Sequence, residues 1–326
     1  MIKIGSAEID TNIFLAPLAG CSDLAFRSIC REYGARFCFF EMLDANCVIN
    51  ERVRTLDIIN TNEKDLPIAA QLLGSDPHLM LNAAEKLLSM VRISFLDLNF
   101  ACPARKVIRK KAGAYMIDNK TAISKILKKM SSSLHLPITV KIRCGYLKRD
   151  IEHITDVAKI CQDSGAKAIF IHGRTSSEGY GGEVDYASIK AVKESVEIPV
   201  FGSGNIFTPV LAKKMFDDTG CDGILVARGA IGNPWIFREI ETYIEKGKEM
   251  TPPTLAKKKT ALKKHIAYIE KYKKIRPASK LGVMRKVAIW YMRDFPEAKK
   301  VRGQIGRTRS YAELSELIRH IKTCGN

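Results

Sequence analysis

The stretch "FLDLNFACPARKV" (residues 95–107) decides the fold that we expect for this chain. Its first eight residues favour a β-strand, Pro103 ends that strand directly after Cys102, and a basic loop follows. Strands that are apolar on both faces belong to a parallel sheet whose outer face is covered by helices. Seven other short runs of this kind, separated by helical patterns, occupy residues 12–20, 37–42, 68–74, 138–144, 168–173, 199–205 and 223–229. Eight such units predict an α/β fold, a (β/α)₈ TIM barrel.

A doubly wound open sheet is the alternative fold. It is less well supported, because no G-x-G-x-x-G sequence opens a helix after the first strand. The pattern changes near residue 245: a Pro-Pro pair at 252–253 predicts a linker, and three amphipathic helices follow it. We therefore expect two domains, a barrel at 1–245 and a small helical bundle at 246–326.

Positive charge is concentrated in the last quarter of the chain. Residues 245–326 hold 22 of the 53 Lys and Arg residues but 7 of the 35 Asp and Glu residues, so they carry +15 of the net charge of +18. A basic segment joined to a nearly neutral one suggests a binding surface for a polyanion such as nucleic acid. A set of solvated lysine-rich helices is the alternative.

Composition also indicates the cellular compartment. The N-terminus "MIKIGSAEIDTNIF" has neither the charge pattern nor the cleavage site of a signal peptide, and no apolar run approaches the length of a membrane span. The nine cysteines are scattered and include no C-x-x-C pair, so neither a disulfide framework nor a metal site is indicated. We expect a cytoplasmic monomer that binds no metal and no membrane.

Glycine-rich motifs follow the last two expected strands. In a barrel of this type, chemistry collects at the C-terminal ends of the strands. "GSGN" (202–205) and "ARGA" (227–230) offer backbone N–H groups and a guanidinium there. Ordinary glycine turns are the alternative for either motif alone. The pair predicts a phosphate site for a mononucleotide cofactor or a phosphorylated substrate.

Other side chains at the strand ends have more than one possible role. Lys141 could form a Schiff base, place a cation near the electron-rich edge of a cofactor, or make a salt bridge. Gln71 and His172 could hydrogen-bond a heterocycle or be satisfied groups of the barrel rim. Cys102 could be a core cysteine or a general acid whose pKa is tuned by nearby cations.

Taken together, the motifs resemble those of the tRNA-dihydrouridine synthase family. "APLAGCSDLAFR", "QLLG", "DLNFACPARKV", "VKIR", "IHGRT", "GSGNI" and "ARGAIGNPW" occur in the family's order and at roughly its spacing. The likeness runs from about residue 10 to 240 and is greatest to the bacterial B-type branch. It implies an FMN enzyme that takes a hydride from NADPH or NADH and reduces the C5=C6 bond of particular uridines in tRNA.

The resemblance also implies roles for single residues. Cys102 would protonate uracil C5 after a hydride has reached C6, and Asn99 would hold an edge of the uracil. Arg174, in "IHGRT", is expected at the substrate. Arg302, Arg307 and Arg309, expected just before the third C-terminal helix, would grip the RNA backbone. FMN is expected to contact Pro17, Leu18, Ala19, Gln71, Lys141 and His172, with its phosphate on Ser203, Gly204, Asn205, Ala227 and Arg228.

Two positions depart from the family pattern, and two rival functions remain. Ala101 stands where the family motif N-x-G-C-P has Gly, which can restrict the backbone. Ser203-Gly204-Asn205 replaces an N-G-D turn, so no carboxylate acts there. One rival is an FMN barrel that acts on a free pyrimidine, similar to dihydroorotate dehydrogenase, which leaves the basic C-terminal segment unexplained. The other is a non-catalytic RNA-binding barrel, which leaves the strand-end residues unexplained.

Overall fold

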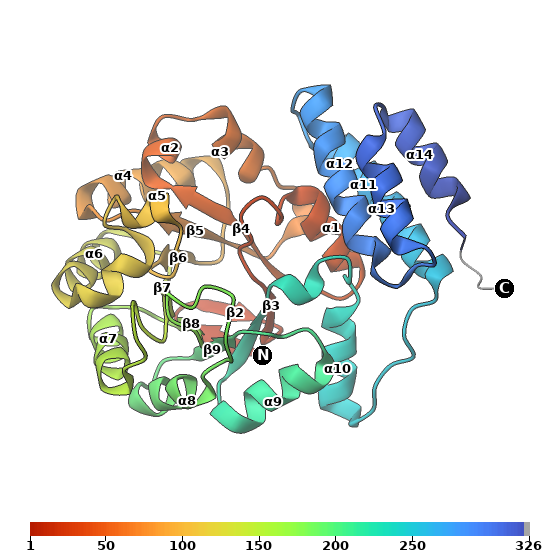
Figure 1. The fold of residues 1–326 in the computed structure, drawn as a ribbon. Coiled ribbons are helices and arrows are strands. Elements are labelled where there is room, and N and C mark those ends of the chain that lie inside the picture. The colour runs from red at the N-terminus through yellow and green to blue at the C-terminus, as the bar shows by residue number, and fades with distance from the viewer. Residues whose placement is uncertain (323–326) are drawn as a thin grey trace.

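Eight parallel strands close into a barrel in a computed structural model that describes residues 1–322 (Figure 1). Around the barrel the order is β10-β3-β4-β5-β6-β7-β8-β9, so consecutive strands pair with each other and the last strand, β10, closes the barrel against the first, β3. The predicted (β/α)₈ fold is therefore confirmed. The strands are β3 (Ile13–Leu15), β4 (Phe37–Asp44), β5 (Ile68–Leu73), β6 (Leu96–Asn99), β7 (Ile138–Arg143), β8 (Ile169–His172), β9 (Val200–Ser203) and β10 (Gly223–Val226).

Helices surround the barrel and fill the loops above it. The outer layer comprises α1 (Leu24–Glu32), α4 (Pro77–Met90), α6 (Lys120–Ser133), α7 (Ile151–Asp163), α8 (Tyr186–Ser195), α9 (Pro209–Thr219) and α10 (Ile236–Lys246). Shorter segments in the loops are α2 (Ala45–Ile49), α3 (Val53–Ile58), α5 (Arg105–Ile108), η1 (Glu63–Asp65), η2 (Gly113–Asp118) and η3 (Arg228–Ala230). Most of the outer helices begin with an Asp, Asn or Thr side chain that accepts a backbone N–H, as in α4, where Asp76 caps Leu79 N.

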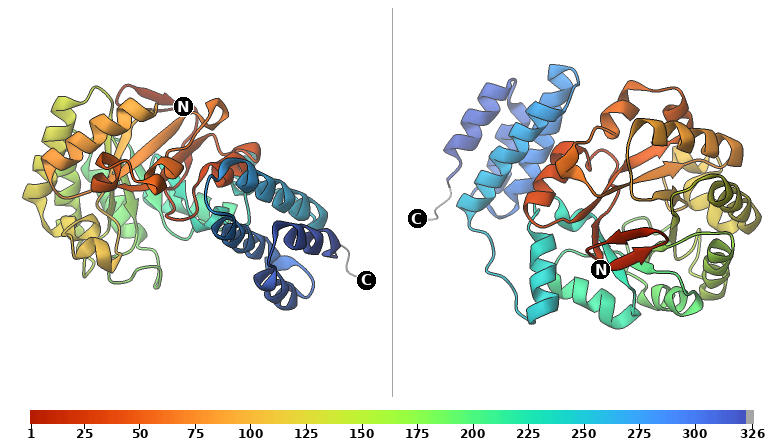
Figure 2. Two further views of the ribbon diagram at one scale, coloured as in Figure 1. Left: turned by 90° about the horizontal axis from the view of Figure 1, so that it is seen from above. Right: turned by 180° about the vertical axis from the view of Figure 1, so that it is seen from behind.

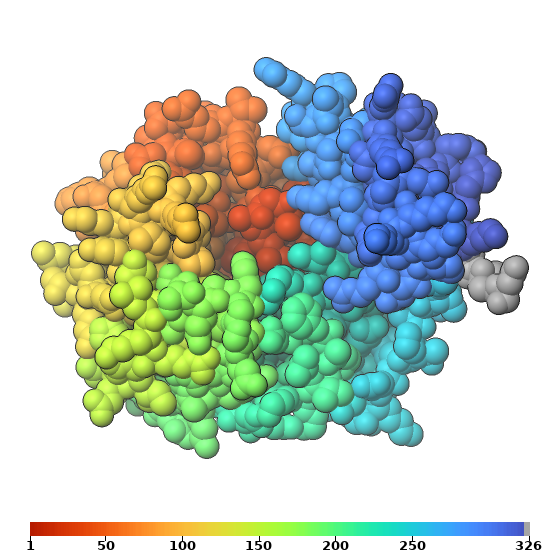
Figure 3. All heavy atoms as spheres, in the orientation of Figure 1, coloured from red at the N-terminus to blue at the C-terminus, as the bar shows by residue number. Residues whose placement is uncertain are grey.

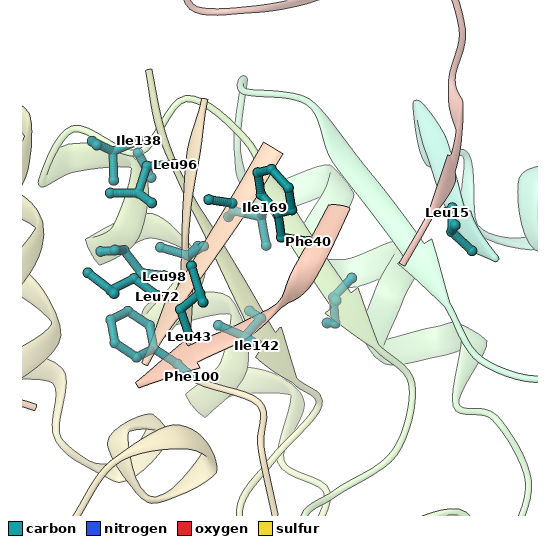
Figure 4. Close-up of a cluster of buried hydrophobic side chains, with 14 of the residues drawn as sticks. Leu15, Phe40, Leu43, Leu72, Leu96, Leu98, Phe100, Ile138, Ile142 and Ile169 are labelled. Atoms are coloured by element: carbon teal, nitrogen blue, oxygen red, sulfur yellow. The ribbon is translucent and has the colours of Figure 1, made fainter. Parts of the chain in front are cut away.

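Alternation along the strands separates an outer aliphatic face from an inner face. Leu96 and Leu98 of β6 and Ile138 and Ile142 of β7 point outward into the layer between strands and helices (Figure 4). The inner face is aromatic in the half of the barrel opposite the mouth, where the rings of six phenylalanines pack together: Phe14, Phe37, Phe39, Phe95, Phe170 and Phe201. Above these rings the inner positions become polar. The strands therefore alternate near their C-terminal ends rather than being apolar throughout, and the alternation turns the polar side chains into the mouth of the barrel.

An N-terminal hairpin, which the sequence did not predict, closes the opposite end of the barrel. It consists of β1 (Ile2–Ile4) and β2 (Ala7–Ile9), which pair antiparallel (Figure 2, right). Ile4 and Ile9 are buried together with the aromatic layer. The mouth at the C-terminal ends of the strands is thus the open end of the barrel.

The C-terminal helices form a second buried core against α1. Residues 247–254 contain no helix or strand, and α11 (Leu255–Tyr272), α12 (Pro277–Tyr291), η4 (Met292–Asp294), α13 (Ala298–Arg307) and α14 (Tyr311–His320) follow. The described part of this region has four α-helices where the sequence predicted three. The missed helix, α13, has two internal glycines, and Val301 and Ile305 are its buried residues, so its apolar pattern is weak. The division into domains at 245 and 246 stays a prediction.

No helix in the described residues is both long and apolar enough to cross a bilayer. The eight cysteines among residues 1–322 are free, and Cys324 lies outside the described residues.

Candidate functional site

A cavity of about 320 Å³ lies at the C-terminal mouth of the barrel. Figure 3 shows this face hollowed near its centre, between the barrel segments and the blue C-terminal helices. The predicted site residues that line the cavity are Pro17, Leu18, Ala19, Gln71, Asn99, Cys102, Lys141, His172, Ser203, Gly204, Asn205, Ala227 and Arg228. They come from seven of the eight strands or from the loops that follow them. The fold thus brings together residues more than two hundred positions apart, while their roles stay predictions.

A chain of hydrogen bonds links a buried carboxylate to the backbone of Cys102. Asp97 accepts from Gln71 Nε2 at 2.7 Å and from Thr139 Oγ1 at 2.8 Å. Gln71 Oε1 in turn accepts from Asn99 Nδ2 at 2.6 Å. Asn99 Oδ1 is then left to accept the backbone N–H groups of residues 101 and 102, at 3.0 and 2.9 Å. Each acceptor fixes the orientation of the next side-chain amide, so this series of hydrogen bonds holds the start of the Cys102 loop in place.

The Cys102 loop is held from its other side as well. Arg143 Nε donates to Ala101 O at 2.7 Å, and Cys102 O accepts from Ala114 N at 3.1 Å. β6 ends at Asn99, so Cys102 lies in the loop and not on the strand. Its side chain is half-buried and faces the cavity. Ala101 has a negative φ, and the family's glycine is therefore not needed at this position for a left-handed backbone.

The electrostatics of the mouth are dominated by cations. Burial and the charge of Arg143 lower the pKa of Lys141 to about 8. Burial and the neighbouring cations, Lys141 first, lower the pKa of His172 to about 2, so its ring is neutral near pH 7. The ammonium group of Lys141 makes no hydrogen bond or ion pair with any residue in the described range, and Lys141 lines the cavity. The mouth therefore offers an unshared ammonium and a neutral imidazole to a bound ring.

The loops after β9 and β10 form a glycine-rich cup. Gly204 and Asn205 have φ values of +142° and +48°, which turn successive peptide groups in different directions. Arg228 lies beside this turn, with Nη2 3.4 Å from Asn205 Oδ1, and stacks on the ring of Tyr180 at 4.5 Å. A Cβ at Gly229 would lie 1.9 Å from Ile206 O, so this glycine lets the two loops touch. The Arg228 guanidinium forms no ion pair with a carboxylate in the described residues, which suits it to an anion.

Four predicted substrate residues do not line the cavity. Arg174 is 1% exposed and donates through Nη2 to Gly182 O at 2.7 Å, so it braces the loop after β8. Arg302, Arg307 and Arg309 are exposed in the C-terminal region, and Arg309 lies in the short loop between α13 and α14, just before the last helix as predicted. Arg302 and Arg307 lie within α13 rather than before the last helix, which corrects the position expected from the sequence.

Several lining residues had no role predicted from the sequence. Tyr180 and Phe207 flank Arg228 at 4.5 and 5.3 Å, Arg143 joins the loops after β6 and β8, and Cys21 adds a second thiol to the wall. Tyr180 sits in a glycine-rich loop without periodicity, so the sequence held no signal for it. The sequence does place Arg143 at the mouth, two residues after Lys141 on the inner face of the same strand, but it did not predict that Arg143 joins the two loops.

Comparisons with known proteins agree with this arrangement. A family model described as "Dihydrouridine synthase (Dus)" matches residues 14–324. The chain is 34% identical over 310 residues to the tRNA-dihydrouridine synthase B of Pseudomonas aeruginosa, covering 94% of this chain and 91% of the relative. It is 34% identical over 318 residues to the Escherichia coli protein of the same name, covering 97% and 98%. Among solved structures, a Rhizobium histamine dehydrogenase has a TM-score of 0.57 at 12% identity, covering 82% of this chain and 50% of that one, which shows the fold alone.

Proposed function

This chain belongs to the dihydrouridine synthase family, and on that premise we propose that it reduces uridines in tRNA to 5,6-dihydrouridine. We further propose FMN as its cofactor and NADPH or NADH as its hydride source. The observation that carries the proposal is the single cavity that collects Cys102, Lys141, His172 and the two glycine-rich loops.

The chemistry of the cavity lining fits FMN. A flavin ring has an electron-rich pyrimidine edge, which the unshared ammonium of Lys141 can neutralise. A phosphate has oxygens that accept from backbone N–H groups and from a guanidinium, which Ser203–Asn205 and Arg228 supply. His172 is neutral and can hydrogen-bond a ring atom without adding charge. The cofactor would supply two-electron transfer, from the nicotinamide to C6 of the uracil.

The protein would supply the proton. Reduction of the C5=C6 bond adds a hydride at C6 and a proton at C5, so an acid must stand over the base. Cys102 is the half-exposed thiol on the loop above the cavity, and it would become a thiolate that water reprotonates. The hydrogen bonds that hold Asn99 and the backbone of Cys102 would keep this loop in a fixed position relative to the cavity.

The substrate must be an RNA that can present an unstacked base. A uridine inside a helix cannot reach a mouth of this depth, so it must swing out, and the protein needs a grip on the backbone. Exposed Arg105, Lys106 and Arg109 beside the mouth, together with the basic C-terminal helices, can supply that grip.

The test is to incubate the purified protein with FMN, NADPH and tRNA that lacks dihydrouridine, and to measure dihydrouridine by mass spectrometry. We expect dihydrouridine in tRNA and no reduction of free uridine or orotate. Reduction of a free pyrimidine alone would favour the dihydroorotate dehydrogenase-like rival. Protein that binds tRNA but takes up no FMN would favour the non-catalytic rival.

A further inference from the structure

Gly20 is the turning point of the loop that forms one wall of the cavity. Pro17, Leu18, Ala19 and Cys21 line the cavity on either side of it. Gly20 has a φ of +74°, a left-handed conformation that glycine adopts at little cost. Its N–H donates to Glu41 Oε2 at 2.5 Å, and its carbonyl oxygen accepts from Lys286 Nζ at 2.5 Å. The two contacts hold the peptide groups before and after Gly20, so together they fix both of its backbone dihedrals.

Two charged side chains are committed to this one glycine. Glu41 is on β4 and is 5% exposed, and burial raises the pKa of its carboxyl group. Among residues 1–322, neither Glu41 nor Lys286 has an oppositely charged partner within 4.0 Å, and the other recorded contact of Lys286 is the ring of Trp290 at 5.2 Å. Burial of a carboxylate without an oppositely charged partner, as at Glu41, costs free energy of folding, and Lys286 is only half-buried, so neither contact is explained by fold stability. Their arrangement is better explained by the shape that they impose on the cavity wall.

Lys286 reaches the wall from outside the barrel. It belongs to α12 of the C-terminal helices, and Gly20 is 266 residues away in the sequence. The bonds inside the loop, from Cys21 N and Ser22 N to Leu18 O, shape the turn but do not tie it to the rest of the molecule. Arg27 Nη1 holds Ser22 O at the end of the loop at 2.6 Å, whereas Glu41 and Lys286 hold Gly20 at the turn itself, and the C-terminal helices supply one of these two contacts at the turn.

We propose that Lys286 is a positioning residue for the flavin site: it holds the Gly20 turn so that Pro17–Ala19 present the surface on which the cofactor rests. The inference builds on the proposed flavin function. It gives the C-terminal helices a part in cofactor binding in addition to their proposed part in RNA binding.

The experiment measures FMN and tRNA dissociation constants for four proteins: wild type, Lys286→Met, Lys286→Arg and Lys264→Met. Lys264→Met is the matched control, because Lys264 pairs with Glu32 at 2.6 Å across the same interface. We expect Lys286→Met to weaken FMN binding about tenfold. Lys286→Arg should restore it to within about threefold because it keeps the donor and charge. Lys264→Met should leave it unchanged, and tRNA binding should change little in all three variants.

Wild-type FMN affinity in Lys286→Met overturns the inference, as does an equal loss in Lys264→Met, which would mark a general effect of the interface. Loss of tRNA binding with unchanged FMN binding would overturn it too, because Lys286 would then be an RNA contact. If the wild-type protein binds no FMN, that result contradicts the proposed function, and this inference fails together with it. Should Lys286→Met not fold, Gly20→Ala perturbs the same turn without a clash, since no atom lies within 4 Å of the added Cβ; unchanged FMN affinity there is the contradicting result.

Discussion

Lys141 and Asp97 lie on neighbouring strands, and burial shifts their pKa values toward each other. The pKa of Asp97 is raised to about 7, and that of Lys141 is lowered to about 8. Asp97 is fully buried and keeps hydrogen bonds from Gln71 and Thr139, whereas Lys141 faces the cavity. A ligand in the cavity therefore meets the charge of Lys141, and that charge is lost within an accessible pH range.

The affinity for FMN should consequently depend on pH. Below pH 8 Lys141 is an ammonium, and as the pH rises through its pKa of about 8 the cation is lost. We expect FMN binding to weaken between about pH 7 and about pH 9.5, and to stay level in Lys141→Arg, since a guanidinium does not titrate there. Fluorescence titrations of flavin at each pH measure this. An equal decline in both proteins would remove Lys141 from the explanation.

The location of a single residue was predictable where its position along a strand determines whether its side chain points into the barrel. Gln71, Lys141 and His172 lie near the C-terminal ends of their strands. Each occupies one of the alternate positions whose side chains point into the barrel, so the strand pattern alone places them in the mouth. Tyr180, Phe207 and Lys286 reach the site from a loop or from another part of the chain. No local pattern encodes contacts of that kind, and they became visible only in the folded molecule.

At the scale of elements, the order of strands and helices was predictable but their ends were not. The run at 12–20 was expected to be one strand, yet β3 ends at Leu15, and the run at 95–102 yields a strand that ends at Asn99. The first loop residues at the mouth are as apolar as the strands that precede them, because they line the cavity or pack beside it. The hairpin β1–β2 was missed since each of its strands has three residues, too few to show a period.

Helix α13 carries a prediction for RNA binding. Arg302 and Arg307 are exposed on it. Reversing both charges, as Arg302→Glu with Arg307→Glu, should weaken tRNA binding at least about tenfold and lower the slope of log affinity against log salt by about 2. Filter binding at several salt concentrations measures both quantities.

The matched control for α13 is the double variant Lys125→Glu with Lys128→Glu. Both lysines are exposed on α6, on the side of the barrel away from the C-terminal helices (Figure 1). If this control weakens tRNA binding as much as the α13 variant does, the effect is one of net charge, and the surface proposed on α13 is wrong.

For the whole molecule, the structure ties the C-terminal helices to the barrel more closely than the sequence suggested. Lys273 of α11's C-terminal end pairs with Asp23 at 3.2 Å and with Asp57 at 2.9 Å, and Ala25 of α1 belongs to the core of the helical bundle. A chain cut near residue 245 would expose this apolar face. Point variants therefore separate cofactor binding from RNA binding more cleanly than truncation does.

The most direct test of the account compares Cys102→Ala with wild type in two reactions of one preparation. The first is reduction of bound flavin by NADPH, followed by absorbance, and the second is dihydrouridine formation in tRNA. A general acid contributes at least about a hundredfold, so the variant should keep the first rate and lose the second by that factor. Cys47→Ala, a half-buried thiol outside the cavity lining, should keep both rates. Dihydrouridine formed at the wild-type rate by Cys102→Ala would contradict the account.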